Sequence, residues 1–429
     1  MKGSETPRGG WVPEVSRLSR WQRVWEPFWA LPLAIAVVAV LAGLGLPRLD
    51  EVVWPWVPIL FEGGPDGARS VLGTITSAMI SVTGLVFSIT MVVLQLASSQ
   101  FTPRVLGSFL DSRITQVTLG VFTGTFLYSL TVLRSVQGSG AEGDRSVPQL
   151  ATSTAYVGVV ASVGLFLAFI HHITTSIQVQ QVVARTAAAT VTTLERMMPL
   201  KQEESATRGE QPRWKPRSEE VATDVSLHAG ADRSITDIDY RRLVGLASRH
   251  DVVITLERQV GDYVVAGTRL AQVWRHRDSE ADTEGLADEI RALVSVDRDR
   301  SLRQDVAFGV RQFVDIAERA LSPGINDPTT AVQVIDALHS VLRRAVQRPV
   351  PSGHVTDSEG AVRLVYSTQT VEHLLELAVT EIAHWGRGSV RVPDHLRRVL
   401  DDLDTVALPA YRGTIAALRR RVIEWDEAT

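Results

Sequence analysis

Four long apolar segments near the start of the chain constrain its fold more than any other feature. Residues 28–46 and 71–100 contain no charged side chain, and the same holds for residues 114–133 and 150–170. At 1.5 Å per residue the shortest of them reaches about 28 Å, close to the thickness of a bilayer's hydrocarbon core. We therefore predict four transmembrane helices within a membrane domain covering residues 1–200, which makes the lipid bilayer the first partner of the chain.

The positions of Lys and Arg around these segments predict an orientation. Five basic residues precede the first segment: Lys2, Arg8, Arg17, Arg20 and Arg23. In the first and third loops, by contrast, arginines are mixed with Asp and Glu. Because loops rich in Lys and Arg stay in the cytoplasm, we expect both termini to be cytoplasmic, so that about 250 residues after the fourth segment are cytosolic. The charged lead of 27 residues is long for a signal peptide, so we expect the first segment to be retained.

Composition and motifs exclude several classes of function. The net charge is −4 and there is no cysteine, which gives no case for nucleic-acid binding and excludes disulfides and thiolate chemistry. Phosphate-binding glycine loops, HExxH and the GxSxG elbow are all absent. Glu381 and His384 have the spacing of half a helical metal site, but no second pair accompanies them. We predict no catalytic residues, no metal site and no cofactor, and hence no enzyme.

The second apolar segment carries a regular stripe of small and polar residues. Thr74, Ser81, Ser88 and Gln95 recur every seven residues, and Ser77 and Gly84 fall on the interleaved positions. This period places them on one face of a helix. Two interpretations remain open: the stripe packs against another membrane helix, or it lines an aqueous path in an oligomer, where neutral hydroxyls hydrate an ion without trapping it.

Two arginines follow this stripe toward the cytoplasm. Arg104 and Arg113 lie in the short loop between the second and third segments. They either anchor the loop on the cytoplasmic side or form a basic ring at the mouth of a path that attracts anions.

The rest of the chain divides by composition. Residues 201–220 lack an apolar period and predict a linker, and residues 221–275 are rich in short β-type runs separated by turn signals. Residues 276–285 predict a second linker, and residues 286–429 a mainly helical domain, with later helices at 371–385 and 396–425. The predicted fold class is four transmembrane helices, a small β-rich module and a mainly α cytosolic domain.

A polar group in the helical domain is a weaker site candidate. Gln304 and Asp305 precede one predicted helix, while Asn326 and Asp327 precede the next. Such residues either cap their helices or meet in a polar pocket for a ligand or ion.

Two resemblances add to this interpretation. The run GDYVVAGTRL at residues 261–270 is similar to the half-repeats of biotinyl and lipoyl domains, but without the lysine that those carriers modify. Three further segments are ISVTGLVFS (80–88), LASSQFTPR (96–104) and ALSPGINDP (320–328). Together with the GDYV run, and in their order along residues 20–410, they resemble a bacterial family of predicted membrane proteins that carry a domain of unknown function. The resemblance implies a four-span protein of the inner membrane and no activity.

These observations leave two function hypotheses from different classes. The first is a homo-oligomeric, channel-like pore, with the second segment lining the path and the cytosolic domain gating it. No span has an ionisable residue near its middle, which disfavours a proton-driven transporter, and four spans leave little room for a closed path in one subunit. The alternative is a membrane-anchored sensor or scaffold, whose cytosolic domain binds a protein partner or a small ligand of unknown identity.

Overall fold

The computed structural model describes most of the chain, and it divides into two compact units. The described residues are 25, 27–53, 64–100, 112–136, 148–176, 178–198, 200, 214–227, 232–276, 283–357 and 359–427. Among these, one unit ends at residue 181, and the other covers residues from 182 onward. The predicted linkers lie largely outside the described residues, so they remain predictions.

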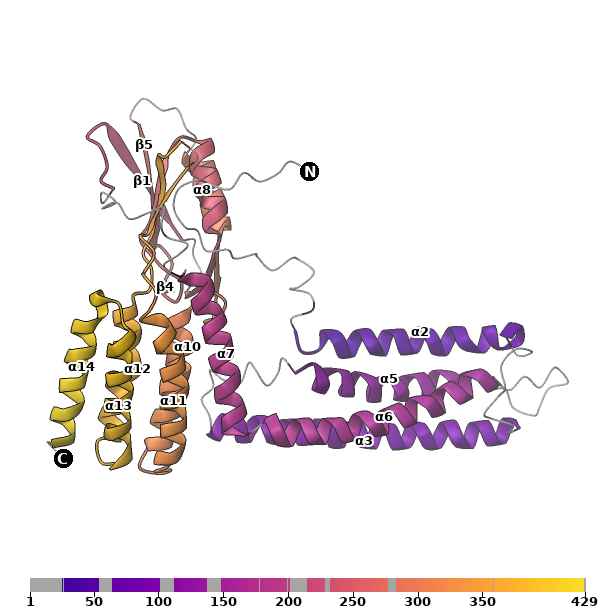
Figure 1. Ribbon diagram of the computed structural model, residues 1–429. Helices are drawn as coiled ribbons and strands as arrows, with labels where there is room; N and C mark the ends of the chain where they lie inside the picture. Colours follow the sequence, from indigo (N-terminus) through magenta and orange to yellow (C-terminus); the bar gives the residue numbers. More distant parts are fainter. Residues whose placement is uncertain are drawn as a thin grey trace. The chain divides into compact units, whose positions relative to one another are not determined.

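The first unit is a bundle of the four long apolar helices that the sequence predicts (Figure 1). These are α2 (Ala30–Val53), α3 (Pro65–Gln100), α5 (Arg113–Ser135) and α6 (Gln149–Ser176). Each is long and apolar enough to cross a bilayer. Helix α3 is longer than its uncharged segment. It starts at Pro65, six residues before that segment begins at residue 71, and proline is well suited to a first helical turn.

Helix α5 is the central helix of this bundle, and α2, α3 and α6 all pack against it. Two glycines allow the closest approach. A Cβ atom on Gly120 would lie 2.7 Å from Ile35 Cδ1 of α2, and one on Gly124 would lie 3.3 Å from Ala39 Cβ. Small residues of this kind let membrane helices approach until their backbones are in contact.

The second unit contains most of α7 (Val179–Met197), a helix that starts three residues after the end of α6. The described residues of this unit form two sheets. The larger has the order β1-β5-β3-β8-β7 and the smaller the order β4-β2-β6. The strands are β1 (Glu220–Ser226), β2 (Arg233–Ile238), β3 (Val253–Leu256), β4 (Tyr263–Val264), β5 (Arg269–His276), β6 (Val294–Asp297), β7 (His354–Thr356) and β8 (Val362–Val365).

The β-rich region is less self-contained than its sequence predicts. Strand β8 pairs in parallel with β3, where Ile254 lies opposite Leu364, and β6 pairs with β2. Both β6 and β8 come from the segment that the sequence assigns to the helical domain, so the boundary at residue 275 is wrong as a domain boundary. Helices α8 (Tyr240–Arg249) and α9 (Thr283–Ala292) contribute to the same apolar core, which buries Ile254 and Leu364 completely.

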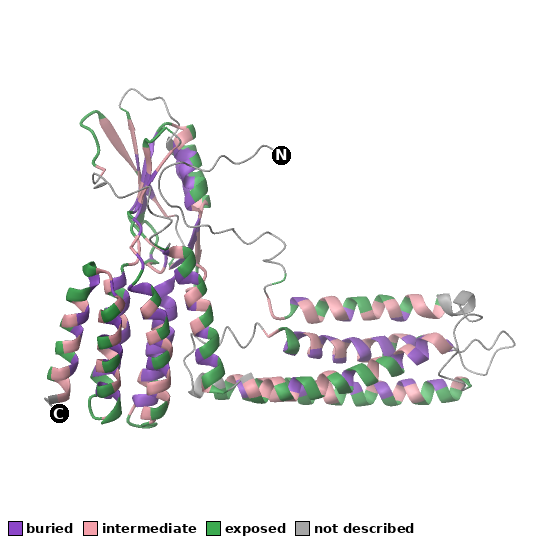
Figure 2. Cartoon of the chain, viewed as in Figure 1, coloured by how far each residue is buried: buried purple, intermediate pink, exposed green. Residues whose placement is uncertain are grey.

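Five helices form the remainder of this unit among the described residues, as the sequence predicts in outline. They are α10 (Val306–Leu321), α11 (Pro328–Ala345), α12 (Val371–Gly386), α13 (Arg391–Val406) and α14 (Pro409–Glu427). The predicted helix at 396–425 is in fact two helices, because Pro409 cannot continue the hydrogen-bond ladder of α13. Each helix turns its apolar side inward, and Figure 2 shows buried residues along the inner faces.

Candidate functional site

Helix α3 has two faces of opposite character. One face packs into the bundle through Leu72, Ile75, Met79, Val86 and Val93, all of which are buried. The opposite face carries the stripe that the sequence singles out, and every member of it is exposed: Thr74, Ser77, Ser81, Gly84, Ser88 and Gln95. Packing of the stripe against another described helix of the same chain is therefore excluded for these residues.

The hydroxyl groups of this stripe bond to their own helix. Thr74 donates to the carbonyl of Ser70 at 2.8 Å, Ser81 to Ser77 at 2.9 Å, and Ser88 to Gly84 at 2.9 Å. A hydroxyl that donates its only hydrogen in this way still presents its oxygen lone pairs outward. The stripe is thus a row of hydrogen-bond acceptors on the outer face of a membrane helix.

Large apolar side chains flank the stripe on both sides. Leu85 and Val92 lie on one flank, Ile80 and Phe87 on the other, and each is about half exposed. No described atom lies within 4 Å of where a Cβ on Gly84 would stand. The surface is therefore open for close approach by a molecule outside this chain.

A second polar region lies inside the bundle of the first unit, and it was not predicted from the sequence. Thr118, Thr125 and Ser129 of α5 are buried, as are Thr152 and Ser162 of α6. The hydroxyls of Thr118 and Ser129 have no hydrogen-bond partner among the described residues. Their signal in the sequence is the low hydropathy of α5, since the least apolar of the four spans is the most deeply buried.

The two arginines proposed for a cytoplasmic mouth are only partly placed. Arg104 lies outside the described residues. Arg113 is the exposed first residue of α5, and its guanidinium donates to Gln116 Oε1 at 3.5 Å. Beside it, Ser112 caps α5 and lies 2.7 Å from Nε2 of His172 at the end of α6. The side chains at this end of the bundle are thus held by hydrogen bonds.

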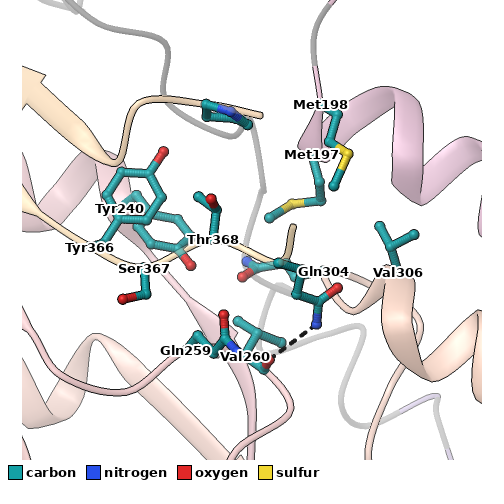
Figure 3. Close-up of a pocket in the computed structure, with 12 residues that line it drawn as sticks. Met197, Met198, Tyr240, Gln259, Val260, Gln304, Val306, Tyr366, Ser367 and Thr368 are labelled. Atoms are coloured by element: carbon teal, nitrogen blue, oxygen red, sulfur yellow. Dashed lines mark hydrogen bonds between the residues drawn. The ribbon is translucent and has the colours of Figure 1, made fainter. Parts of the chain in front are cut away.

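A small pocket lies in the second unit, at the carboxyl end of α7 (Figure 3). Its volume is about 30 Å³, room for one or two water molecules or a small polar group. Figure 3 shows Tyr240 and Tyr366 on one side and Met197 and Met198 on the other. None of the twelve residues that line this pocket is an Asp, Glu, Lys, Arg or His.

Two polar atoms at this pocket are buried without a partner. The hydroxyl of Tyr366 and Oε1 of Gln259 make no hydrogen bond to any described residue, and only 6% of Tyr366 is exposed. Burial raises the pKa of both Tyr366 and Tyr240, so that both phenols stay protonated. A phenol and an amide oxygen left in this state suit a neutral ligand or water that both accepts and donates.

The four residues proposed for a polar pocket do not meet. Gln304 lines the pocket described above and donates to Asp237 and to the carbonyl of Ile238. Asp305 caps α10 and pairs with Arg300. Asn326 and Asp327 lie beyond the other end of α10, a helix of 16 residues that spans about 24 Å.

The second pair has a structural role instead. Asp327 accepts hydrogen bonds from the backbone of Thr329 and Thr330 and so caps α11. The hydrogen bond from the Thr330 hydroxyl, together with these backbone bonds, holds the pKa of Asp327 below its usual value. The prediction that Asn326 and Asp327 share a pocket with Gln304 and Asp305 is wrong, and the alternative prediction of capping residues accounts for both aspartates.

Comparison with known proteins gives the chain its relatives. The family model "Predicted membrane protein (DUF2254)" matches residues 25–402, which is most of the chain. The chain belongs to this family. Uncharacterized proteins of Mycobacterium bovis and Mycobacterium tuberculosis are 32% identical to this DUF2254 chain over 383 residues, covering 88% of the chain and 71% of each relative. No solved structure matches it.

Proposed function

We propose that this DUF2254 protein is a homo-oligomeric, channel-like pore in which α3 lines the path and the second unit, lying in the cytosol, gates it. The observation that carries the proposal is the outward direction of the stripe on α3. Polar groups on a lipid-facing surface gain nothing from lipid, whereas they are satisfied against water or another subunit. A ring of subunits that turn their stripes toward one axis provides that environment.

The chemistry of the stripe suits weak binding of ions. Its hydroxyl oxygens point outward as acceptors, and no Asp, Glu, Lys or Arg interrupts residues 71–96. Acceptors without formal charge replace part of an ion's hydration shell and still release it, which conduction requires. Because acceptors face the path, we expect cations to be favoured over anions within it, whereas Arg113 at its end favours anions. In this proposal the protein lies in a bacterial inner membrane, and both of its termini are in the cytoplasm.

Single-channel recording in planar bilayers tests conduction. We expect discrete current steps from the purified protein, and a Ser81→Leu/Ser88→Leu variant should lose them or lower their amplitude, because two acceptor positions become apolar. Gly164→Leu is the matched control, since Gly164 is exposed on α6 and no described atom lies within 4 Å of its Cβ position. Silence of the wild-type protein across voltage, pH and membrane tension would overturn the proposal.

Oligomer formation has its own test. Gly84 and Gly164 are both exposed membrane glycines with open space around them, but only Gly84 lies on the stripe. Gly84→Leu is therefore expected to reduce the oligomer, as measured by mass photometry in nanodiscs, while Gly164→Leu leaves it intact. Equal effects of the two substitutions, or a monomeric wild-type protein, would contradict the proposal.

The pocket of the second unit supports a second candidate function, a membrane-anchored sensor of a small neutral ligand. The observation that carries it is that the Tyr366 hydroxyl and Gln259 Oε1, both at this pocket, have no hydrogen-bond partner among the described residues. Native mass spectrometry of protein purified from its host tests this candidate. We expect an added mass that is lost in Tyr366→Phe, while the exposed Tyr263→Phe retains it. A wild-type protein that carries no added mass would speak against the sensor.

A further inference from the structure

Two loops at one end of the helices of the second unit expose apolar side chains. Ile325, between α10 and α11, is 48% exposed, and Val390, between α12 and α13, is 88% exposed. The guanidinium of Arg391 donates to Thr329 Oγ1 at 3.2 Å, which ties the second loop to the start of α11. We call residues 322–327 and 387–391 together the loop tip.

The first loop of the tip is held by its own backbone, so the exposure of Ile325 is built into the fold. The amides of Ile325 and Asn326 donate to the carbonyl of Ser322, and the amide of Asp327 donates to Ala320 at 2.7 Å. Asn326 adopts a positive φ of 48°, a conformation that Asn tolerates better than most residues. An apolar side chain held outward by a fixed loop is typical of an interaction surface.

The charges beside these side chains are mainly positive. Residues 319–328 and 385–391 contain three arginines, Arg319, Arg387 and Arg391, all of them exposed. Their one carboxylate, Asp327, is occupied in capping α11. Exposed aliphatic groups next to arginines are the combination that binds an anionic lipid surface, where arginines meet phosphates and aliphatic groups enter the headgroup layer.

The course of α7 and α10 shows which end of the unit carries the tip. Gly309 of α10 is packed closely against Thr190 of α7, and Thr193, one turn later, donates to the carbonyl of Leu302, before α10 begins. The two helices therefore run in opposite directions. The end of α10 lies about 18 Å along its axis from Gly309, and the start of α7 lies about 17 Å from Thr190 on the same side.

The start of α7 is in turn held near the end of the fourth candidate span. Ser176 ends α6 and Val179 begins α7, so their Cα atoms are at most about 11 Å apart. The first loop of the tip follows directly on the end of α10, at the level where α7 begins, and the bond from Arg391 to Thr329 holds the second loop beside it. The connection between α6 and α7 is therefore short enough for the loop tip to reach the surface of a bilayer that α6 crosses.

From these observations we propose that the loop tip docks on the bilayer surface and binds anionic phospholipid headgroups. Ile325 and Val390 enter the headgroup layer, and Arg387 and Arg391 contact its phosphates. This contact is independent of conduction, since it would hold the second unit at the membrane whether or not α3 lines a pore.

The experiment uses the full-length protein in nanodiscs. Because the chain has no cysteine, Ile325→Cys and Val390→Cys each accept a single environment-sensitive NBD probe. Tyr263→Cys is the matched control, since Tyr263 is 64% exposed and follows Gly261, which lies against Asp305 at the opposite end of α10. In nanodiscs that contain phosphatidylglycerol we expect blue-shifted emission at 325 and 390, quenched by phospholipid with a doxyl group near the headgroup. The probe at 263 should keep its aqueous emission.

The contribution of the arginines is tested on the labelled Val390→Cys protein. Removing two arginines with Arg387→Gln/Arg391→Gln should weaken docking by roughly thirtyfold, at about 1 kcal/mol for each arginine. Aqueous emission at both tip positions would overturn the proposal. So would a blue shift that persists in detergent and is insensitive to doxyl lipid, because it would reveal burial against protein. Quenching at position 263 as well would also overturn it.

Discussion

Arg311 of α10 donates from one nitrogen to both carboxylate oxygens of Glu381 of α12, each at 2.6 Å. The same guanidinium also binds Asp315 at 2.6 Å and Glu318 at 3.0 Å. One cation therefore serves three carboxylates in a partly buried position between two helices. Burial, and then the proximity of Glu381, raise the pKa of Glu318 to about 7.

This raised pKa predicts a pH dependence of stability. The folded protein holds a proton on Glu318 up to about pH 7, whereas the unfolded chain releases it near pH 4.5. Between these values the folded state binds more protons, so the contribution of Glu318 is fully present below pH 4.5 and is lost as pH rises through 7. In Glu318→Gln this loss should disappear, so that the variant gains stability relative to wild type at about pH 8.

Thermal unfolding of the solubilised protein between about pH 5 and pH 8 measures this effect. Glu376→Gln is a suitable control, because Glu376 is exposed on α12. A Glu318→Gln protein whose pH profile parallels that of wild type would show that Glu318 is not the titrating group.

The sequence predicts faces well and their partners poorly. The seven-residue period of Thr74, Ser81 and Ser88 defines one side of α3 without any structure, because a helix repeats its directions regularly. Whether that side meets α5 or the outside depends on the opposite, buried face of α3, which starts at Leu72 and packs against α5. Such contacts join residues that are far apart in the chain and leave no periodic trace.

The sheets show the same limit. Turn signals at Gly261 and Gly267 are correct, since both residues have a positive φ. In contrast, the parallel pairing of β8 with β3 joins Leu364 to Ile254, and a short strand carries no mark of so distant a partner. For the same reason the pocket near Tyr240 and Tyr366, whose rings are 4.7 Å apart, was not predictable from either segment alone.

A pair of glycine substitutions tests the contact between α7 and α10. Gly309→Ala places a methyl group against Thr190, and we expect it to destabilise the second unit by about 1–3 kcal/mol. Gly245→Ala in α8 meets no described atom within 4 Å and should stabilise it by roughly 0.5–1 kcal/mol, because Ala is the better helix former. Limited proteolysis across a denaturant series gives both values. The same sign for the two variants would refute the close contact.

Arg348 connects α7 to the end of α11. Its guanidinium donates to the carbonyl of Met198 at 2.8 Å, and the residue is 6% exposed. Arg348→Gln should cost about 1–3 kcal/mol, because a buried carbonyl loses its donor. Arg344→Gln is the control, since Arg344 is exposed and bonds within its own helix, to Ser340. Chemical denaturation in detergent compares them, and equal midpoints would mean that the bond to Met198 contributes no net stability.

The close approach of α2 and α5 can be tested in the membrane unit itself. A Cβ on Gly120 would lie 2.7 Å from Ile35 Cδ1 and 3.1 Å from the backbone of Pro32. The side chain of Ile35 can move, but the backbone cannot, so Gly120→Ala should destabilise the bundle by about 1–3 kcal/mol. Gly164→Ala, on the open face of α6, should have little effect. Size-exclusion chromatography after graded heating measures the fraction still folded. A Gly120→Ala protein as heat-resistant as Gly164→Ala would mean that α2 does not pack on α5 through this glycine.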